Sequence, residues 1–156
     1  MAEAEKARVK PAKQDWKEAN ELLVAVGKQD EARVRRLLGI GYNPDESESA
    51  TRPSGVNGME DGDSALLLAL RVRNLVIARL LLVAGATIDL AMGEYGMTVL
   101  MVAAGNNLLD FARLFFEFRA NPNVVSKIGT TAQLAAMNGH AAMTRLLVDH
   151  GAALNV

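Results

Sequence analysis

The chain of 156 residues contains no cysteine. Without thiols it can form no disulfide, use no thiolate nucleophile and build no cysteine-ligated zinc site. With only two histidines, a nitrogen-ligated zinc site also lacks ligands, so we expect no metal and no cofactor. The absence of cysteine suits a reducing compartment, and we expect the protein in the cytoplasm or nucleus.

The sequence also lacks a long apolar run. The longest candidate, LVIARLLLVAGA, is interrupted by Arg79 and is too short to cross a bilayer. The N-terminus, MAEAEKARVKPAKQD, carries charges throughout and has no apolar stretch of the kind found in secretory signals. We therefore expect no membrane association, and we interpret residues 1–15 as a flexible charged leader.

Positive charge is not in excess, because 17 Lys and Arg residues face 18 Asp and Glu residues. Binding to a phosphate backbone needs a broad positive field, so we expect no nucleic-acid partner. The basic run RVRRLL has Glu31 four residues before Arg35, which favours a solvated helix face over a binding patch. Aromatic residues make up only 4% of the chain, which favours thin helices in close contact.

Three stretches of 26 residues resemble one another. They are SALLLALRVRNLVIARLLLVAGATID from Ser64, TVLMVAAGNNLLDFARLFFEFRANPN from Thr98 and TTAQLAAMNGHAAMTRLLVDHGAALN from Thr130. Successive starts are 34 and 32 residues apart, and the difference falls in connecting segments, where insertion is tolerated. A degenerate fourth copy, ELLVAVGKQDEARVRRLLGIGYNPD, precedes them.

The last stretch has the local signals of two short helices. Thr130 can cap the first helix while Gln133, three residues on, reaches back to it in a capping box. Gly139 then breaks that helix, residues 142–149 form the second, and Gly151 ends it in a left-handed conformation. One such pair cannot bury its own apolar stripe, so it needs neighbours on both sides.

This pattern resembles the ankyrin repeat, whose motif is Gly-x-Thr-Pro-Leu-His-x-Ala-Ala, Gly-His, Leu-Leu and Gly-Ala-x-x-Asn. In the last unit the matching residues are Thr130, Ala135, Ala136, Gly139, His140, Leu146, Leu147, Gly151, Ala152 and Asn155. The resemblance implies an all-α ankyrin-type solenoid over residues 16–156, with about four helix-turn-helix units joined by β-hairpin-like loops. The units fall at about 16–45, 62–91, 96–125 and 128–156. A tetratricopeptide array has a similar period but lacks the Gly-Ala-x-x-Asn segment.

The chain departs from the family pattern in three places. No unit has the full Thr-Pro-Leu-His, so the hydrogen bonds usually made by that His are missing or altered. Between the first two units, a polar, acidic insertion at about residues 45–61 is interpreted as a mobile loop, either a tolerated insertion or a binding segment. No capping unit follows Asn155, which suits a piece of a longer protein, or a last helix made polar enough by Arg145, Asp149 and His150.

His140, Asp149 and His150 are the candidates for catalysis. His140 occupies the Gly-His position of the repeat, where it caps or bridges helices, and His150 lies in the turn before Gly151. Asp149 and His150 are adjacent on one helix, so their side chains diverge and cannot form a base with its orienting partner. We interpret all three as structural, and an enzyme would need a site built from carboxylates and amides alone.

Ankyrin arrays generally bind other proteins through a concave face made by hairpin tips and first-helix edges. At the tips this face carries Glu60, Asp61, Asp63, Met92, Glu94, Tyr95, Met97, Ser126, Lys127 and Ile128. The helix edges carry Arg71, Val72, Gly105, Asn106, Met137 and Asn138. Met92, Tyr95, Met97 and Met137 form either an adhesive stripe for an apolar peptide or contacts between adjacent hairpins. The acidic tips could attract a basic partner segment.

The sequence therefore predicts a monomeric, non-enzymatic module that binds a protein or peptide. The alternative is a structural spacer or regulatory ankyrin domain inside a larger multidomain protein. A binder should have a preferred partner that is sensitive to changes on the concave face, and a spacer should not.

Overall fold

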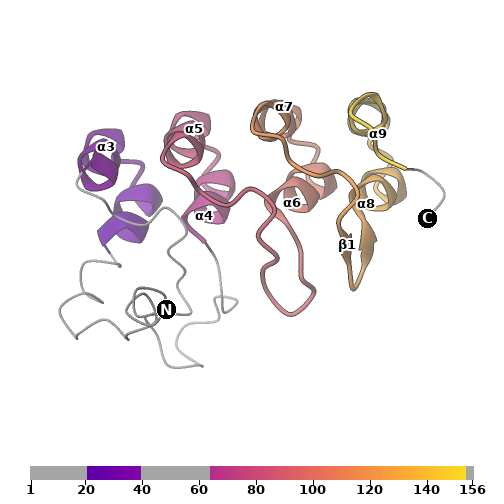
Figure 1. The fold of residues 1–156 in the computed structure, drawn as a ribbon, viewed down its shortest axis with the longest axis horizontal. Helices are drawn as coiled ribbons and strands as arrows, with labels where there is room; N and C mark the ends of the chain where they lie inside the picture. Colours follow the sequence, from indigo (N-terminus) through magenta and orange to yellow (C-terminus); the bar gives the residue numbers. More distant parts are fainter. Residues whose placement is uncertain (1–20, 40–63, 154–156) are drawn as a thin grey trace, which may run out of the picture.

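The computed structural model describes residues 21–39 and 64–153, and its helices stand in two rows (Figure 1). The outer row contains α3 (Glu31–Gly39), α5 (Leu75–Val83), α7 (Leu109–Glu117) and α9 (Ala141–Asp149). The inner row contains the helical residues 21–27, α4 (Ala65–Arg71), α6 (Val99–Gly105) and α8 (Thr131–Met137). The predicted leader at residues 1–15 and the insertion at about 45–61 lie outside the described residues.

Each inner helix and the outer helix that follows it form one unit. The second unit is α4 with α5, the third is α6 with α7, and the fourth is α8 with α9, and the two helices of each pair pack together. Along the inner row α4 contacts α6 and α6 contacts α8, while along the outer row α3 contacts α5 and α5 contacts α7. This is the stacked helical solenoid that the repeat predicted.

Two loops project from the inner row on the same side (Figure 1). In the first, Met92 and Met97 exchange backbone hydrogen bonds of 2.9 and 3.0 Å. In the second, β1 (Val125–Ser126) and β2 (Gly129–Thr130) pair in antiparallel fashion. The N–H of Lys127 donates to the carbonyl of Tyr95 at 2.9 Å, so the two hairpin loops are joined edge to edge.

The inner helices α4, α6 and α8 begin at hydroxyl side chains. Ser64, Thr98 and Thr130 each accept a hydrogen bond from the backbone N–H three residues on, at 3.2, 3.4 and 3.3 Å. In α8 the Oε1 of Gln133 also accepts from the N–H of Thr130 at 2.9 Å, which confirms the predicted capping box. These cap positions are buried, so water cannot accept hydrogen bonds from the first N–H groups of the helices. The cap side chains accept them instead.

Left-handed residues end the helices at matching positions. After the inner helices they are Gln29, Arg73, Asn107 and Gly139, with φ of 55°, 56°, 56° and 72°. After the outer helices of the second to fourth units they are Gly85, Arg119 and Gly151, with φ of 99°, 63° and 93°. Glycine adopts this conformation freely, whereas a side chain makes it cost about 1 kcal/mol. The predicted breaks at Gly139 and Gly151 are confirmed, and Arg73 and Arg119 make the same turns under strain.

One apolar core runs through all four units. Ala69, Ala103 and Ala135 on successive inner helices are fully buried, because small side chains let these helices lie close together. Met101 and Met143 are also fully buried, which confirms their predicted place in the core. No unit has a core of its own, so each depends on its neighbours.

Polar side chains join the end of one unit to the end of the next. The Oδ1 of Asp89 accepts from the N–H of Asn121 at 2.9 Å. At the equivalent position one unit later, Asn123 accepts from the N–H of Ala153 at 2.9 Å and donates to the carbonyl of Gly151 at 3.0 Å. Asn123 therefore makes two contacts where Asp89 makes one, since a carboxylate has no N–H to donate.

Replacing Arg119 with Gly should stabilise the fold. Glycine removes the strain at φ 63°, and we expect the free energy of unfolding to rise by about 0.5–1 kcal/mol after the added entropy of the unfolded chain is subtracted. Urea denaturation measures the change. An Arg119→Ala control removes the guanidinium but keeps the Cβ atom and should be near neutral. Equal stability of the two variants would contradict the strain argument.

Replacing Asn123 with Ala should lower the free energy of unfolding by about 1–2 kcal/mol, because both of its hydrogen bonds to the fourth unit are lost. Asp89→Ala is the matched control and loses one hydrogen bond, so its effect should be smaller. Both are measured by urea denaturation at constant pH. A larger loss for Asp89→Ala than for Asn123→Ala would show that the contacts do not set the stability.

Candidate functional site

Apart from Met92 and Met97, the predicted partner-binding residues that the structure describes lie in two rows. We define the tip row as Glu94, Tyr95, Lys127 and Ile128, on the two projecting loops. We define the edge row as Arg71, Asn106, Met137 and Asn138, at the C-terminal ends of α4, α6 and α8. Glu60, Asp61 and Asp63 lie outside the described residues, so their predicted role stays a prediction.

The tip row is exposed and partly apolar. Tyr95 is 49% exposed and Ile128 is 43% exposed. Glu94 and Lys127 beside them are exposed charges of opposite sign. Val125, at the start of β1, adds a further exposed apolar side chain that was not among the predicted tip residues. In a strand of two residues, β1, the sequence has no alternating pattern to show which side chain faces outward. The pairing of β1 with β2 in the structure shows that it is Val125.

Met92 is not part of this exposed surface. It is only 7% exposed, and the hydroxyl of Ser64 lies 3.3 Å from its sulfur. Its backbone pairing with Met97 turns the side chain toward the start of α4, and Met97 is itself half-buried. With its side chain buried, Met92 does not lie on the exposed surface that the predicted adhesive stripe requires.

In the edge row the two asparagines are engaged with the backbone. Asn106 Nδ2 donates to the carbonyl of Val102 at 2.8 Å. Asn138 Nδ2 donates to the carbonyl of Leu134 at 3.0 Å and lies 3.4 Å from that of Gly105. These side chains close the ends of α6 and α8. Met137, directly before Asn138, is 79% exposed, which makes it the most exposed large apolar side chain of the described residues.

The two histidines are used to hold the fold together. His140 Nε2 lies 3.0 Å from the carbonyl of Gly105 in the preceding unit, which confirms that it bridges helices. The ring of His150 stacks on Phe116 of the third unit with centroids 4.1 Å apart, and its Nδ1 lies 2.8 Å from the carbonyl of Leu146. Because a carbonyl can only accept, each ring donates at the nitrogen named. Neither ring is oriented toward Asp149 as a catalytic pair requires.

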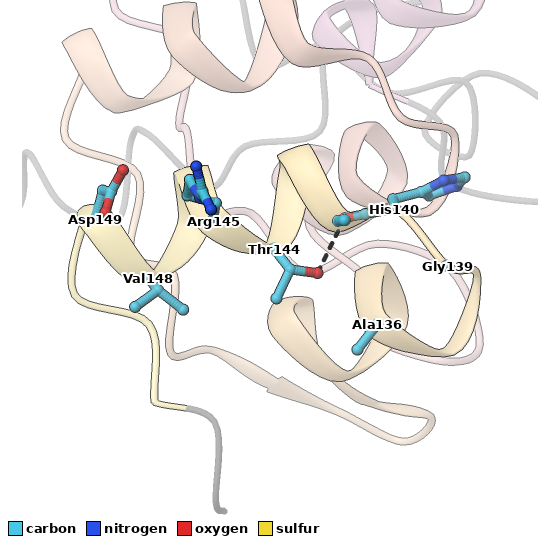
Figure 2. Close-up of a pocket in the computed structure, with 8 residues that line it drawn as sticks. Ala136, Gly139, His140, Thr144, Arg145, Val148 and Asp149 are labelled. Carbon is cyan, nitrogen blue, oxygen red and sulfur yellow. Dashed lines mark hydrogen bonds between the residues drawn. The ribbon is translucent and has the colours of Figure 1, made fainter.

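An open depression of about 490 Å³ lies on the end of the fourth unit, between α8 and α9 (Figure 2). Its lining residues are Ala136, Gly139, His140, Ala141, Thr144, Arg145, Val148 and Asp149. The Thr144 hydroxyl donates to the carbonyl of His140 at 3.0 Å within its own helix, as the dashed line in Figure 2 shows. The lining is mostly apolar, and its polar groups do not converge on a common point.

Within residues 21–39 and 64–153 no helix has the length and apolar character needed to cross a bilayer. The same residues contain no group of three or more histidine or acidic side chains placed to hold a metal ion.

Comparison with known proteins agrees with the stacked fold. A family model of ankyrin repeats, in three copies, matches residues 22–126. An ankyrin repeat-containing protein of Treponema pallidum (strain Nichols) is 33% identical over 109 residues, which are 66% of this chain and 36% of that protein. The chain thus spans about a third of the length of this relative. Ankyrin repeats are generally protein–protein interaction modules and are typically non-enzymatic. With the family model covering well over half of the sequence and the helix pairs stacked as the repeat requires, the chain belongs to the ankyrin repeat family.

Proposed function

We propose that this chain binds a polypeptide across the tip row and the edge row of its third and fourth units, without catalysing a reaction. The observation that carries the proposal is the exposure of apolar side chains on these two units. Tyr95 and Ile128 in the tip row and Met137 in the edge row are all exposed large apolar residues. Apolar area in water is unfavourable, and a partner that covers it gains free energy.

The side chains suit an apolar peptide or the apolar face of a helix. A methionine side chain adapts to irregular surfaces because it is flexible and polarisable, and full burial of one contributes about 1.5–3 kcal/mol. Tyrosine adds a large rigid area with a polar end, which is typical of binding hot spots. Met137 and Tyr95 are therefore the proposed anchors of the interface.

The charged residues of the tip row would orient the partner. Glu94 and Lys127 flank the apolar side chains with opposite charges, so they favour one direction of binding over the other. Asn106 and Asn138 already donate to helix carbonyls, so in this proposal they support the surface without acting as its main contacts. Specificity then rests on the shape of the apolar surface and the order of the charges.

The test compares two double variants. In Tyr95→Ala with Met137→Ala, both proposed anchors are removed, and the Kd for a partner captured from the source cells should rise at least about 30-fold, the equivalent of ~2 kcal/mol. The matched control is Val76→Ala with Val83→Ala, which removes two exposed apolar side chains from the outer helix α5. The control should bind as the unaltered chain does.

Both double variants alter exposed positions, so their urea midpoints should stay close to that of the unaltered chain. Unchanged Kd for the Tyr95 and Met137 variant, with its fold intact, would refute the proposed surface. A chain that captures no partner at all would support the spacer interpretation.

A further inference from the structure

The turn between α8 and α9 contains an asparagine followed by a glycine, the pair of residues most prone to deamidation in a polypeptide. Two asparagines of the chain precede a glycine, Asn57 and Asn138, and Asn57 lies outside the described residues. Asn138 and Gly139 are both exposed, so water reaches them. Gly139 also lines the depression in Figure 2.

The reaction at such a pair has two steps. The backbone nitrogen of Gly139 loses its proton to solvent and attacks the side-chain carbonyl carbon of Asn138. A C–N bond forms, and the side-chain nitrogen takes up a proton and leaves as ammonia, which closes a five-membered succinimide ring. Water then adds to one of the two ring carbonyls and opens the ring to an aspartate or an isoaspartate. Glycine favours the first step, because it has no side chain to hinder the attacking nitrogen.

The folded turn holds the reacting atoms apart. The ψ angle of Asn138 is 2°, so the nitrogen of Gly139 is eclipsed with the backbone nitrogen of Asn138 and is turned away from its Cβ atom. Closing the ring requires rotation about the Cα–C bond of Asn138. That rotation breaks the hydrogen bond of 3.0 Å from the N–H of Gly139 to the carbonyl of Ala136. The side chain is held as well, because its Nδ2 donates to the carbonyl of Leu134 at 3.0 Å.

The turn is too short to rotate by itself, since residues 138–140 are all that join α8 to α9. The N–H of His140 donates to the carbonyl of Ala135 at 2.9 Å. The ring of His140 lies 3.0 Å from the carbonyl of Gly105 in the preceding unit. Rotation at Asn138 therefore separates α9 from α8 and loosens the fourth unit from the third.

We propose that Asn138 is a deamidation site controlled by the opening of the fourth unit. The side-chain amide is stable while α8 and α9 are packed together, and it reacts with Gly139 when they separate. The rate in the folded protein then equals the rate in the unfolded chain multiplied by the fraction of molecules whose fourth unit is open. This reaction is independent of the proposed partner binding.

The product prevents the turn from closing as it did before. Asn138 Nδ2 donates to the carbonyl of Leu134 and lies 3.4 Å from that of Gly105. An aspartate at this position has no proton to donate, and its charge faces carbonyl oxygens at the C-terminal end of a helix, where negative charge is unfavourable. The isoaspartate also lengthens the main chain by a methylene group. Each reaction therefore leaves a chain whose fourth unit opens more often.

The third unit contains a matched position that lacks the glycine. Asn106 follows α6 with a ψ angle of 7°, and its Nδ2 donates to the carbonyl of Val102 at 2.8 Å. The next residue is Asn107, with φ of 56° where Gly139 has 72°. A side chain at this place hinders the attacking nitrogen, so Asn106 should react slowly in the folded and in the unfolded chain.

The test follows deamidation by peptide mass spectrometry while the full chain stands in mildly alkaline buffer, with and without urea above its unfolding midpoint. In urea, Asn138 should react about as fast as Asn57, and in native buffer at least about 50-fold more slowly than in urea. Asn123→Ala loosens the fourth unit and should raise the native rate at Asn138 about 5- to 30-fold. Asp89→Ala acts one unit earlier and should raise this rate less.

Equal rates at Asn138 with and without urea would overturn the proposal, and so would a native rate that Asn123→Ala leaves unchanged. The effect of the product is measured with Asn138→Asp, which should lower the urea midpoint. Asn106→Asp is its control and should lower the midpoint less, because Asn106 donates within its own helix. A midpoint for Asn138→Asp equal to that of the unaltered chain would contradict the claim that the product keeps the unit open.

Discussion

The packing of each helix pair against its neighbours is the contact on which the rest of the structure depends. The inner helices α4, α6 and α8 are only seven residues long, too short to be stable alone, and their fully buried alanines bury little area except against another helix. Stability is therefore shared along the row and resides in the surfaces between units. The backbone hydrogen bond from the N–H of Lys127 to the carbonyl of Tyr95 also joins neighbouring units.

This constraint separates the residues that fold the chain from those free to serve function. The helix faces between units must stay apolar and small, and the caps must keep a side-chain hydrogen-bond acceptor. The loop tips and the ends of the inner helices are under neither requirement, and there the units differ: Arg71, Gly105 and Met137 are the equivalent last residues of α4, α6 and α8. A surface that varies while the scaffold repeats is well suited to recognising one particular polypeptide.

The sequence predicted the parts of the fold that depend on local rules. The capping box at Thr130, the break at Gly139 and the core position of Met143 follow from short-range patterns, and the structure confirms all three. The direction of side chains in the hairpins could not be obtained in this way. Met92 and Tyr95 lie three residues apart in one loop, yet one is buried and the other exposed, because backbone pairing with Met97 sets the register. The stacking of His150 on Phe116 likewise depends on how two units meet in space.

Connection through nearest neighbours alone also sets how the molecule responds to mechanical tension. The fourth unit is held to the third by a few parallel contacts, among them His140 to Gly105 and Asn123 to Ala153. A pull applied to the two ends acts on the contacts between all units in series, so the weakest surface between two units separates first. The array should therefore open unit by unit, and lengthen in steps of about 30 residues.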